Sequence, residues 1–101
     1  MRFALPQKGA YEIESFPSQP QVAICHGFFV PVGGRNQGFA HVLKRHQTDT
    51  LERLGYDFAI CTVAAGNIAQ KRVLTQANWI RLAEFDNSKT GERTELWGYE
   101  L

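Results

Sequence analysis

Several features are scarce in this chain, and each scarcity excludes a class of protein. Only two cysteines are present among 101 residues, so no disulfide framework is expected. No run approaches the roughly 20 apolar residues of a membrane span, and residues 1–6 are too poor in apolar residues for a signal peptide. The net charge is only +1, which leaves no basic surface for nucleic acid. We therefore expect a single cytoplasmic domain over residues 1–101, with no membrane or nucleic-acid partner.

The hydrophobic pattern alternates between strands and helices. A strand, a helix and a second strand follow one another in the middle of the chain, which predicts a β-α-β unit with a parallel pair. The last two strands are separated by a turn at residues 86–91 and predict a C-terminal hairpin. The expected strands are 11–14, 21–30, 58–63, 80–85 and 93–101, and the expected helices are 39–54 and 68–77.

The strand at 21–30 is almost continuously apolar, so we expect both of its faces to be covered. Gly27 interrupts it, which predicts a bulge or a close approach of another backbone. In the helix at 39–54, apolar residues recur at intervals of three and four, whereas Lys44 and Gln47 fall mostly outside that apolar face.

Smaller signals mark the ends of these elements. Gly55 is expected to end the first helix in a left-handed conformation, and Asn78 the second. Asn67 is a plausible N-cap of the second helix. Cys25 and Cys61 lie inside apolar strands, so buried free thiols are favoured over a disulfide.

Three glycines and an arginine lie between the first long strand and the first helix, in residues 33–38. Glycines at such a junction let the backbone turn tightly, and the helix N-terminus adds N–H groups that bind anions. A P-loop needs Lys and Ser/Thr after its last glycine, where Phe39 and Ala40 follow Gly38 instead. The dinucleotide fingerprint is absent too. We interpret the junction as a phosphate-binding loop; an ordinary glycine-rich turn before a helix is the alternative.

The pattern Arg35-x-x-Gly38-x-Ala40 resembles the Arg/Gln-x-x-Gly-x-Gly/Ala pyrophosphate motif of the GNAT N-acyltransferase superfamily. The segment from Asn67 to Trp79 is similar to the family's second-helix motif, although Leu74 stands where the family often has tyrosine. The resemblance covers residues 22–101, and the helices that usually open the family's fold have no counterpart. It implies an α/β (α+β) fold: a mixed, mostly antiparallel sheet with a central parallel β-α-β pair, two main helices and a C-terminal β-hairpin.

The resemblance also implies a coenzyme A site. The pantetheine arm would lie between the two parallel strands where they part, and the first helix would hold the pyrophosphate at its N-terminus. No metal is expected, because the histidines lack partners at metal-ligand spacing. The implied cofactor-binding residues are Phe28, Phe29, Val30, Arg35, Asn36, Gln37, Gly38, Phe39, Ala40 and Asn67.

The implied function is an acyl-CoA-dependent N-acyltransferase that moves an acetyl group from acetyl-CoA to a primary amine by direct attack. A backbone N–H near Val30 would meet the oxyanion. His26 is the candidate general base, since its ordinary pKa suits that role; a solvated or hydrogen-bonded strand histidine is the alternative. The acceptor would be a small-molecule or peptide amine, and an exposed hairpin edge favours a homodimer. A catalytically inactive GNAT-like module that binds CoA or a protein partner is the alternative function.

Overall fold

A computed structural model describes residues 1–34 and 38–101 of the chain. In chain order the elements are β1 (Arg2–Leu5), β2 (Gly9–Phe16), β3 (Gln19–Phe29), a 3-10 turn (Val32–Gly34), α1 (Phe39–Arg53), β4 (Phe58–Ala64), α2 (Ile68–Gln76), β5 (Ile80–Asp86) and β6 (Arg93–Glu100). Each strand and helix expected from the sequence is therefore present. The short strand β1 was not expected.

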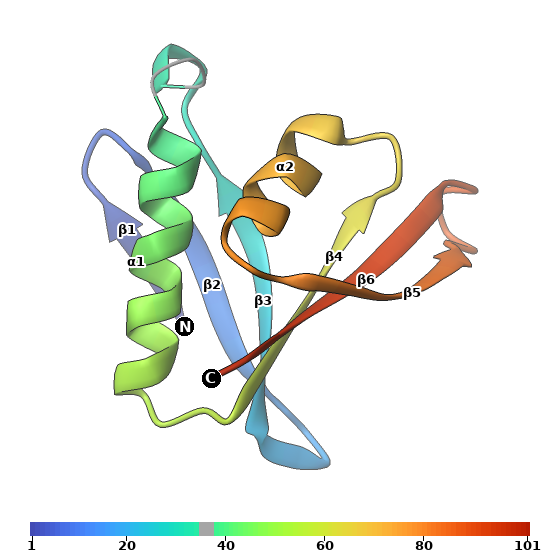
Figure 1. Ribbon diagram of the computed structural model, residues 1–101, viewed down its shortest axis with the longest axis horizontal. Helices are drawn as coiled ribbons and strands as arrows, with labels where there is room; N and C mark the ends of the chain where they lie inside the picture. Colours follow the sequence, from blue (N-terminus) through green and yellow to red (C-terminus); the bar gives the residue numbers. More distant parts are fainter. Residues whose placement is uncertain (35–37) are drawn as a thin grey trace.

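The strands form one sheet in the order β1-β2-β3-β4-β6-β5 (Figure 1). Only β3 and β4 run parallel among the described strands, and the other neighbouring pairs are antiparallel. Helix α1 is the crossover between the parallel strands, and β5 and β6 form the final hairpin. The predicted fold class is confirmed. No helix in the described part of the chain is long and apolar enough to cross a membrane.

The hydrophobic core lies between the sheet and the two helices. Helix α1 packs along β2 and beside α2 (Figure 1). Inward-facing residues of the strands meet the inward-facing leucines of the helices, as the alternation of strand side chains requires. The buried residues of this core are Tyr11, Ile13, Ala23, Cys25, Leu43, Leu51, Ala59, Val63, Leu74, Trp79 and Trp97.

The expectation that both faces of the first long strand are covered is wrong. Ala23 and Cys25 of β3 are buried beneath the helices, but His26 on the opposite face is exposed. The side chain of Phe29 is 54% exposed. The reason is that both helices lie on one side of β3, and no described segment covers the other side.

The buried face of α1 also differs from the expected one. Lys44 and Gln47 are 2% and 0% exposed, whereas Val42 is 43% exposed. Hydrophobic spacing placed the lysine and the glutamine on the polar side of the helix. In the structure these two side chains face the cleft where β3 and β4 part. They are buried there, but they do not pack into a continuous apolar interface.

A hydrogen-bonded cluster joins α1 to the sheet. The hydroxyl of the fully buried Tyr11 in β2 lies 2.7 Å from His46 Nδ1 and 2.8 Å from Thr50 Oγ1. Thr50 in turn donates to the carbonyl of His46 at 2.8 Å. Each of the hydroxyls therefore has a partner, which is the condition under which buried polar groups stabilise a fold.

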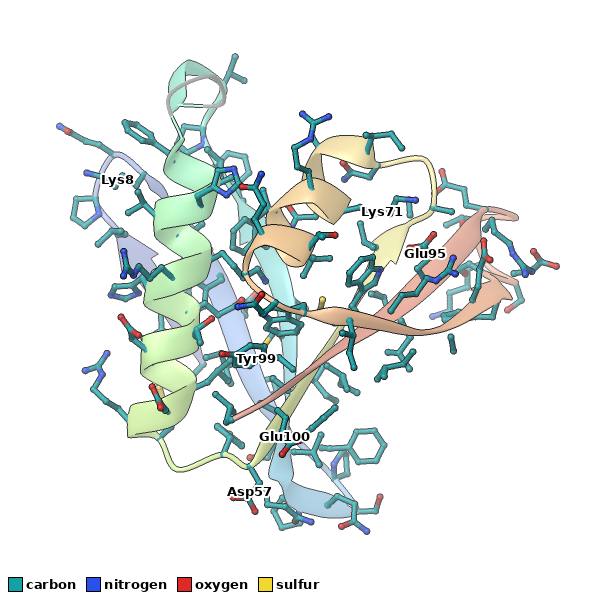
Figure 2. The ribbon with its side chains drawn as sticks, in the orientation of Figure 1. Lys8, Asp57, Lys71, Glu95, Tyr99 and Glu100 are labelled. Carbon is teal, nitrogen blue, oxygen red and sulfur yellow. The ribbon has the colours of Figure 1, made fainter. Side chains whose placement is uncertain are left out.

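Helix α2 is held against β6 by a buried carboxylate (Figure 2). Lys71 Nζ lies 3.2 Å from Glu95 Oε2, and Trp97 Nε1 donates to Glu95 Oε1 at 2.9 Å. Burial alone would raise the pKa of Glu95, but these two hydrogen bonds, together with the charges of Lys71 and Arg81, outweigh it and lower the pKa. This contact fixes α2 next to the region where the parallel strands separate.

Candidate functional site

The parallel pairing of β3 and β4 ends early and leaves a cleft. The last paired residues are Ile24 and Ile60, yet β3 continues to Phe29 and β4 to Ala64. Beyond that register the strands part around a cleft of about 320 Å³. The lining comes from residues 25–28 of β3, residues 61–64 of β4, Lys44 and Gln47 of α1, and Asn67, Gln70 and Leu74 at α2.

A bulge in β3 borders the cleft. Ala10 pairs with Phe29 and Glu12 with His26, so two residues of β3 stand opposite one residue of β2. Gly27 within this bulge has a φ of +62°, a conformation that glycine adopts without strain. A bulge bends the strand that carries it, here in the half that turns away from β4. The bulge predicted at Gly27 is confirmed.

Helix α1, which lines the cleft through Lys44 and Gln47, begins without a side-chain cap. Its N-cap is Gly38, at a φ of +74°, and no acidic residue occupies the first turn. The first N–H groups of a helix have no acceptor within the helix, and the helix dipole makes them attractive to anions. Phe39 and Ala40 supply the first of these groups. The predicted loop residues Arg35, Asn36 and Gln37 lie outside the described residues.

The structure places only some of the other predicted cofactor residues at the cleft. Phe28 and Asn67 line the cleft, from β3 and from the start of α2. Asn67 is the N-cap of α2, where its side chain accepts a hydrogen bond from the N–H of Gln70 at 3.1 Å. This confirms the predicted cap. Phe29 ends β3 and Val30 follows it, but neither is among the described lining residues.

Sequence reasoning missed the most unusual residues of the cleft. Lys44 Nζ donates a hydrogen bond to Gln47 Oε1 at 2.7 Å and lies over the rings of Phe28, at 4.8 Å, and Trp79, at 4.3 Å. Burial lowers the pKa of Lys44 from its ordinary value. The only signal in the sequence was the i,i+3 spacing of the two polar residues, which is equally common on solvated helix faces.

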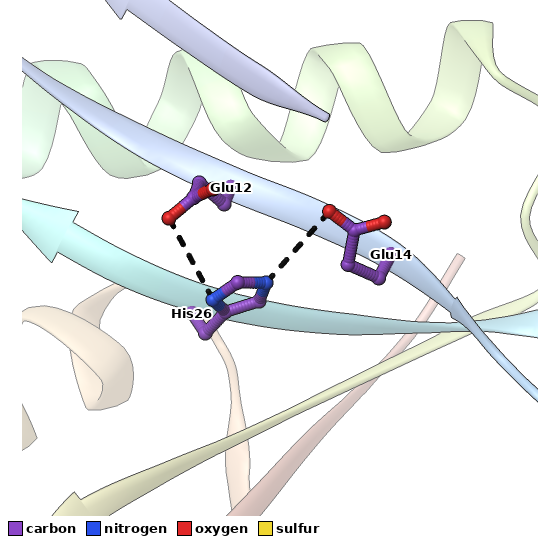
Figure 3. Close-up of side chains that lie close together, drawn as sticks. All are labelled: Glu12, Glu14 and His26. Atoms are coloured by element: carbon purple, nitrogen blue, oxygen red, sulfur yellow. Dashed lines mark ion pairs between the residues drawn. The ribbon is translucent and has the colours of Figure 1, made fainter.

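His26 lies at the edge of the cleft, with its ring on the face of the sheet opposite the helices (Figure 3). Its Nδ1 is 3.8 Å from Glu12 Oε2, and its Nε2 is 4.0 Å from Glu14 Oε1. The ring is 46% exposed, so it is open to solvent. The spacing of the three side chains also falls within the range of a metal-ligand group.

The two thiols of the cleft are poor nucleophiles. Both cysteines are free, and they lie on neighbouring strands just beyond the last paired register. Burial raises the pKa of Cys25 to about 12 and also raises the pKa of Cys61. A thiol reacts as its thiolate, so neither group is activated. The predicted assignment as buried free thiols is confirmed for Cys25, and Cys61 is half-buried.

No protein-family description matches this chain, and no curated protein sequence matches it. Solved structures do match. The IAA acetyltransferase from Bacillus cereus superposes with a TM-score of 0.83 at 14% identity, over 92% of this chain and 69% of that chain. A Bacillus subtilis acetyltransferase in complex with CoA gives 0.79 at 16%, over 92% and 68%. A GCN5-related N-acetyltransferase from Kribbella flavida gives 0.77 at 17%, over 92% and 60%.

These matches define the class of fold. The chain has the GNAT fold, so the resemblance inferred from Arg35-x-x-Gly38-x-Ala40 is confirmed at the level of structure. This chain spans between 60% and 69% of the length of each of the three acetyltransferases described above.

Proposed function

We propose that this chain is an acyl-CoA-dependent N-acyltransferase that transfers an acyl group, in the simplest case acetyl, to a primary amine. The observation that carries the proposal is the cleft between the parting parallel strands, lined by α1, a helix whose N-terminus has no side-chain cap. A parted strand pair offers backbone groups to an extended amide-containing ligand. A helix N-terminus offers N–H groups to a pyrophosphate. The two together match the two halves of coenzyme A.

In this proposal the cofactor contacts are those implied by the resemblance. The backbone of Phe28, Phe29 and Val30 pairs with the pantetheine amides, and the loop from Arg35 to Ala40 holds the pyrophosphate. Asn67 contacts the cofactor from the start of α2. The backbone N–H near Val30 stabilises the oxyanion of the tetrahedral intermediate.

His26 acts as general base on the open face of the sheet. The neutral acceptor nitrogen attacks the thioester carbon, the C–S bond breaks, and the amine proton passes to the imidazole. The departing CoA thiol has an ordinary pKa of roughly 8.5, so it leaves without an acid. We expect His26→Gln to lower kcat/KM while CoA binding is retained, because glutamine cannot take the amine proton. An unchanged kcat/KM would remove His26 from the reaction.

The first test is binding of CoA by calorimetry to the wild type, Gly38→Asp and Gly91→Asp. Gly38 and Gly91 have φ of +74° and +72°, and a Cβ at either would meet no atom of the described residues within 4 Å. The two variants thus carry the same charge and similar backbone strain, but only one places a carboxylate at the start of α1. We expect Gly38→Asp to weaken CoA binding by roughly tenfold or more, because the carboxylate occupies the anion site.

The outcomes separate the two candidate functions. Binding that is lost in Gly38→Asp and kept in Gly91→Asp supports the CoA site. Release of free thiol from acetyl-CoA in the presence of amines then supports the enzyme. Binding without turnover favours an inactive CoA-binding module, a candidate supported by Leu74, which offers no proton to the leaving thiol. No binding by the folded wild type refutes both.

A homodimer is part of this proposal. The edge strand β5 exposes Ile80, Leu82 and Phe85, which are 60%, 46% and 42% exposed. An apolar edge strand readily pairs with a second copy. Sedimentation velocity of the wild type and Leu82→Lys tests this, and a wild-type monomer at micromolar concentration would contradict it. A cytoplasmic location is likewise proposed.

A further inference from the structure

The cleft contains a buried lysine without a counter-charge. Lys44 is 2% exposed, and no carboxylate of residues 1–34 or 38–101 lies within 4.0 Å of its ammonium. Its contacts are one amide oxygen, from Gln47, and the faces of two aromatic rings, Phe28 and Trp79. These contacts replace only part of the hydration that an ammonium loses on burial.

Beside the ammonium lies a second donor. Gln47 is fully buried, and its Nε2 has no hydrogen-bond partner among the described residues. The lysine fixes how this amide is oriented, because Nζ has only protons to give and therefore requires the oxygen of Gln47. The amide protons are thus left available next to the cation. Both residues line the cleft.

These two donors share the cleft with the residues nearest the end of strand pairing. Cys25 and Cys61, each the next residue after the last paired register, line the same space as Lys44. Helix geometry places Lys44 roughly 9 Å along the axis from Gly38. A ligand with its phosphates at the start of α1 therefore reaches the lysine with a different part of its structure.

The chemistry that satisfies this pair is a carboxylate. It supplies a full negative charge to the ammonium and two oxygens for two adjacent donors, in a site whose other walls include Phe28, Leu74 and the two protonated thiols. A neutral acetyl group carries no negative charge to pair with the ammonium of Lys44. Resting on the proposed function, we propose that the acyl donor carries a carboxylate on its acyl chain, as a short dicarboxylic acyl-CoA does, and that Lys44 and Gln47 bind it.

The test compares two thioesters of equal chain length. Succinyl-CoA and butyryl-CoA each carry a four-carbon acyl group, and only the former ends in a carboxylate. Their dissociation constants are measured by calorimetry on the full chain for the wild type, Lys44→Met and the control Lys89→Met, which removes an exposed lysine in the turn after β5. Thermal unfolding verifies that each variant is folded.

We expect the wild type and Lys89→Met to bind succinyl-CoA roughly tenfold or more tightly than butyryl-CoA, and Lys44→Met to bring this ratio near one. Equal affinities in the wild type overturn the inference, whatever the variants do. A preference that persists in Lys44→Met overturns it as well. If Lys44 contacts the thioester rather than an acyl carboxylate, Lys44→Met weakens the binding of succinyl-CoA and butyryl-CoA alike, which is a third contrary result. Binding of CoA with no preference leaves the proposed function standing, and no binding of any CoA compound overturns both.

Discussion

Replacing Lys44 and Gln47 together by apolar residues of similar size should make this fold more stable. The double variant is Lys44→Met with Gln47→Leu. It removes a buried ammonium that lacks a carboxylate partner and a buried amide whose Nε2 lacks an acceptor among the described residues. A fold normally avoids such groups, and the proposed carboxylate ligand would account for their presence in the cleft.

The magnitude follows from the completeness of the burial. The two residues are 2% and 0% exposed, so the methionine and leucine side chains would be almost entirely covered. Replacing a buried ion pair by apolar residues of similar volume is often neutral or stabilising by about 1–4 kcal/mol, and Lys44 lacks even a carboxylate partner among the described residues. For a domain of this size, each 1 kcal/mol changes Tm by about 4–8 °C. We therefore expect Tm to rise by at least about 4 °C.

Tyr11→Phe is the matched control. Its hydroxyl is buried like the amide of Gln47, but it has two partners, His46 at 2.7 Å and Thr50 at 2.8 Å. Removing it takes one hydrogen-bond partner from each of these two residues, which should lower the free energy of unfolding by about 1–3 kcal/mol. The same type of change, buried polar to apolar, thus has opposite signs at the two sites.

Urea unfolding followed by circular dichroism measures both variants against the wild type. The m-value verifies that the unfolding transition still exposes the same surface. A double variant less stable than the wild type would refute the reasoning. In that case the contacts of the Lys44 ammonium with the rings of Phe28 and Trp79 would contribute more than its burial costs, and the pair would be structural.

Three further predictions concern other parts of the fold. Gly9→Ala should lower the free energy of unfolding by about 3 kcal/mol or more, because its Cβ would lie 2.1 Å from the carbonyl oxygen of Phe29; urea midpoints check this, and a small change like that expected for Gly66→Ala would contradict it. Asn67→Ala should cost about 1 kcal/mol through loss of the N-cap of α2, whereas Asn67→Asp keeps the cap; equal midpoints for the two variants would count against it. Cys25 should react with a thiol reagent at pH 8 roughly a thousandfold more slowly in the folded than in the unfolded chain, because burial raises its pKa from 9.0 to about 12. The thiol of Cys25 ionises at a lower pH in the unfolded chain than in the folded one, so its contribution to stability is present below pH 9 and is lost as the pH rises toward 12. Comparing the stability of the wild type with that of Cys25→Ala across this pH range measures the loss. Labelling of folded Cys25 at the rate of the unfolded chain would disprove the burial argument.

The sequence by itself determined the order of the elements. Apolar runs and helical spacing predicted the parallel pair and the final hairpin, and Gly55, Asn67 and Asn78 marked helix ends that the structure confirms. These signals are local, because the backbone conformation of a glycine or an N-cap depends on its immediate neighbours. The strand β1 escaped prediction, since its four residues are too few to establish an alternation.

Only the tertiary structure decided what the cleft contains. The early end of pairing at Ile24 and Ile60 depends on strand register and on the bulge at Gly27, and neither is encoded in the spacing of residues along one element. Lys44 and Gln47 face the place where the strands part and are buried there, although both resemble solvated residues in the helical pattern. Hydrophobic periodicity reports which side of a helix is apolar, but whether a polar side is exposed depends on what the rest of the chain places opposite it.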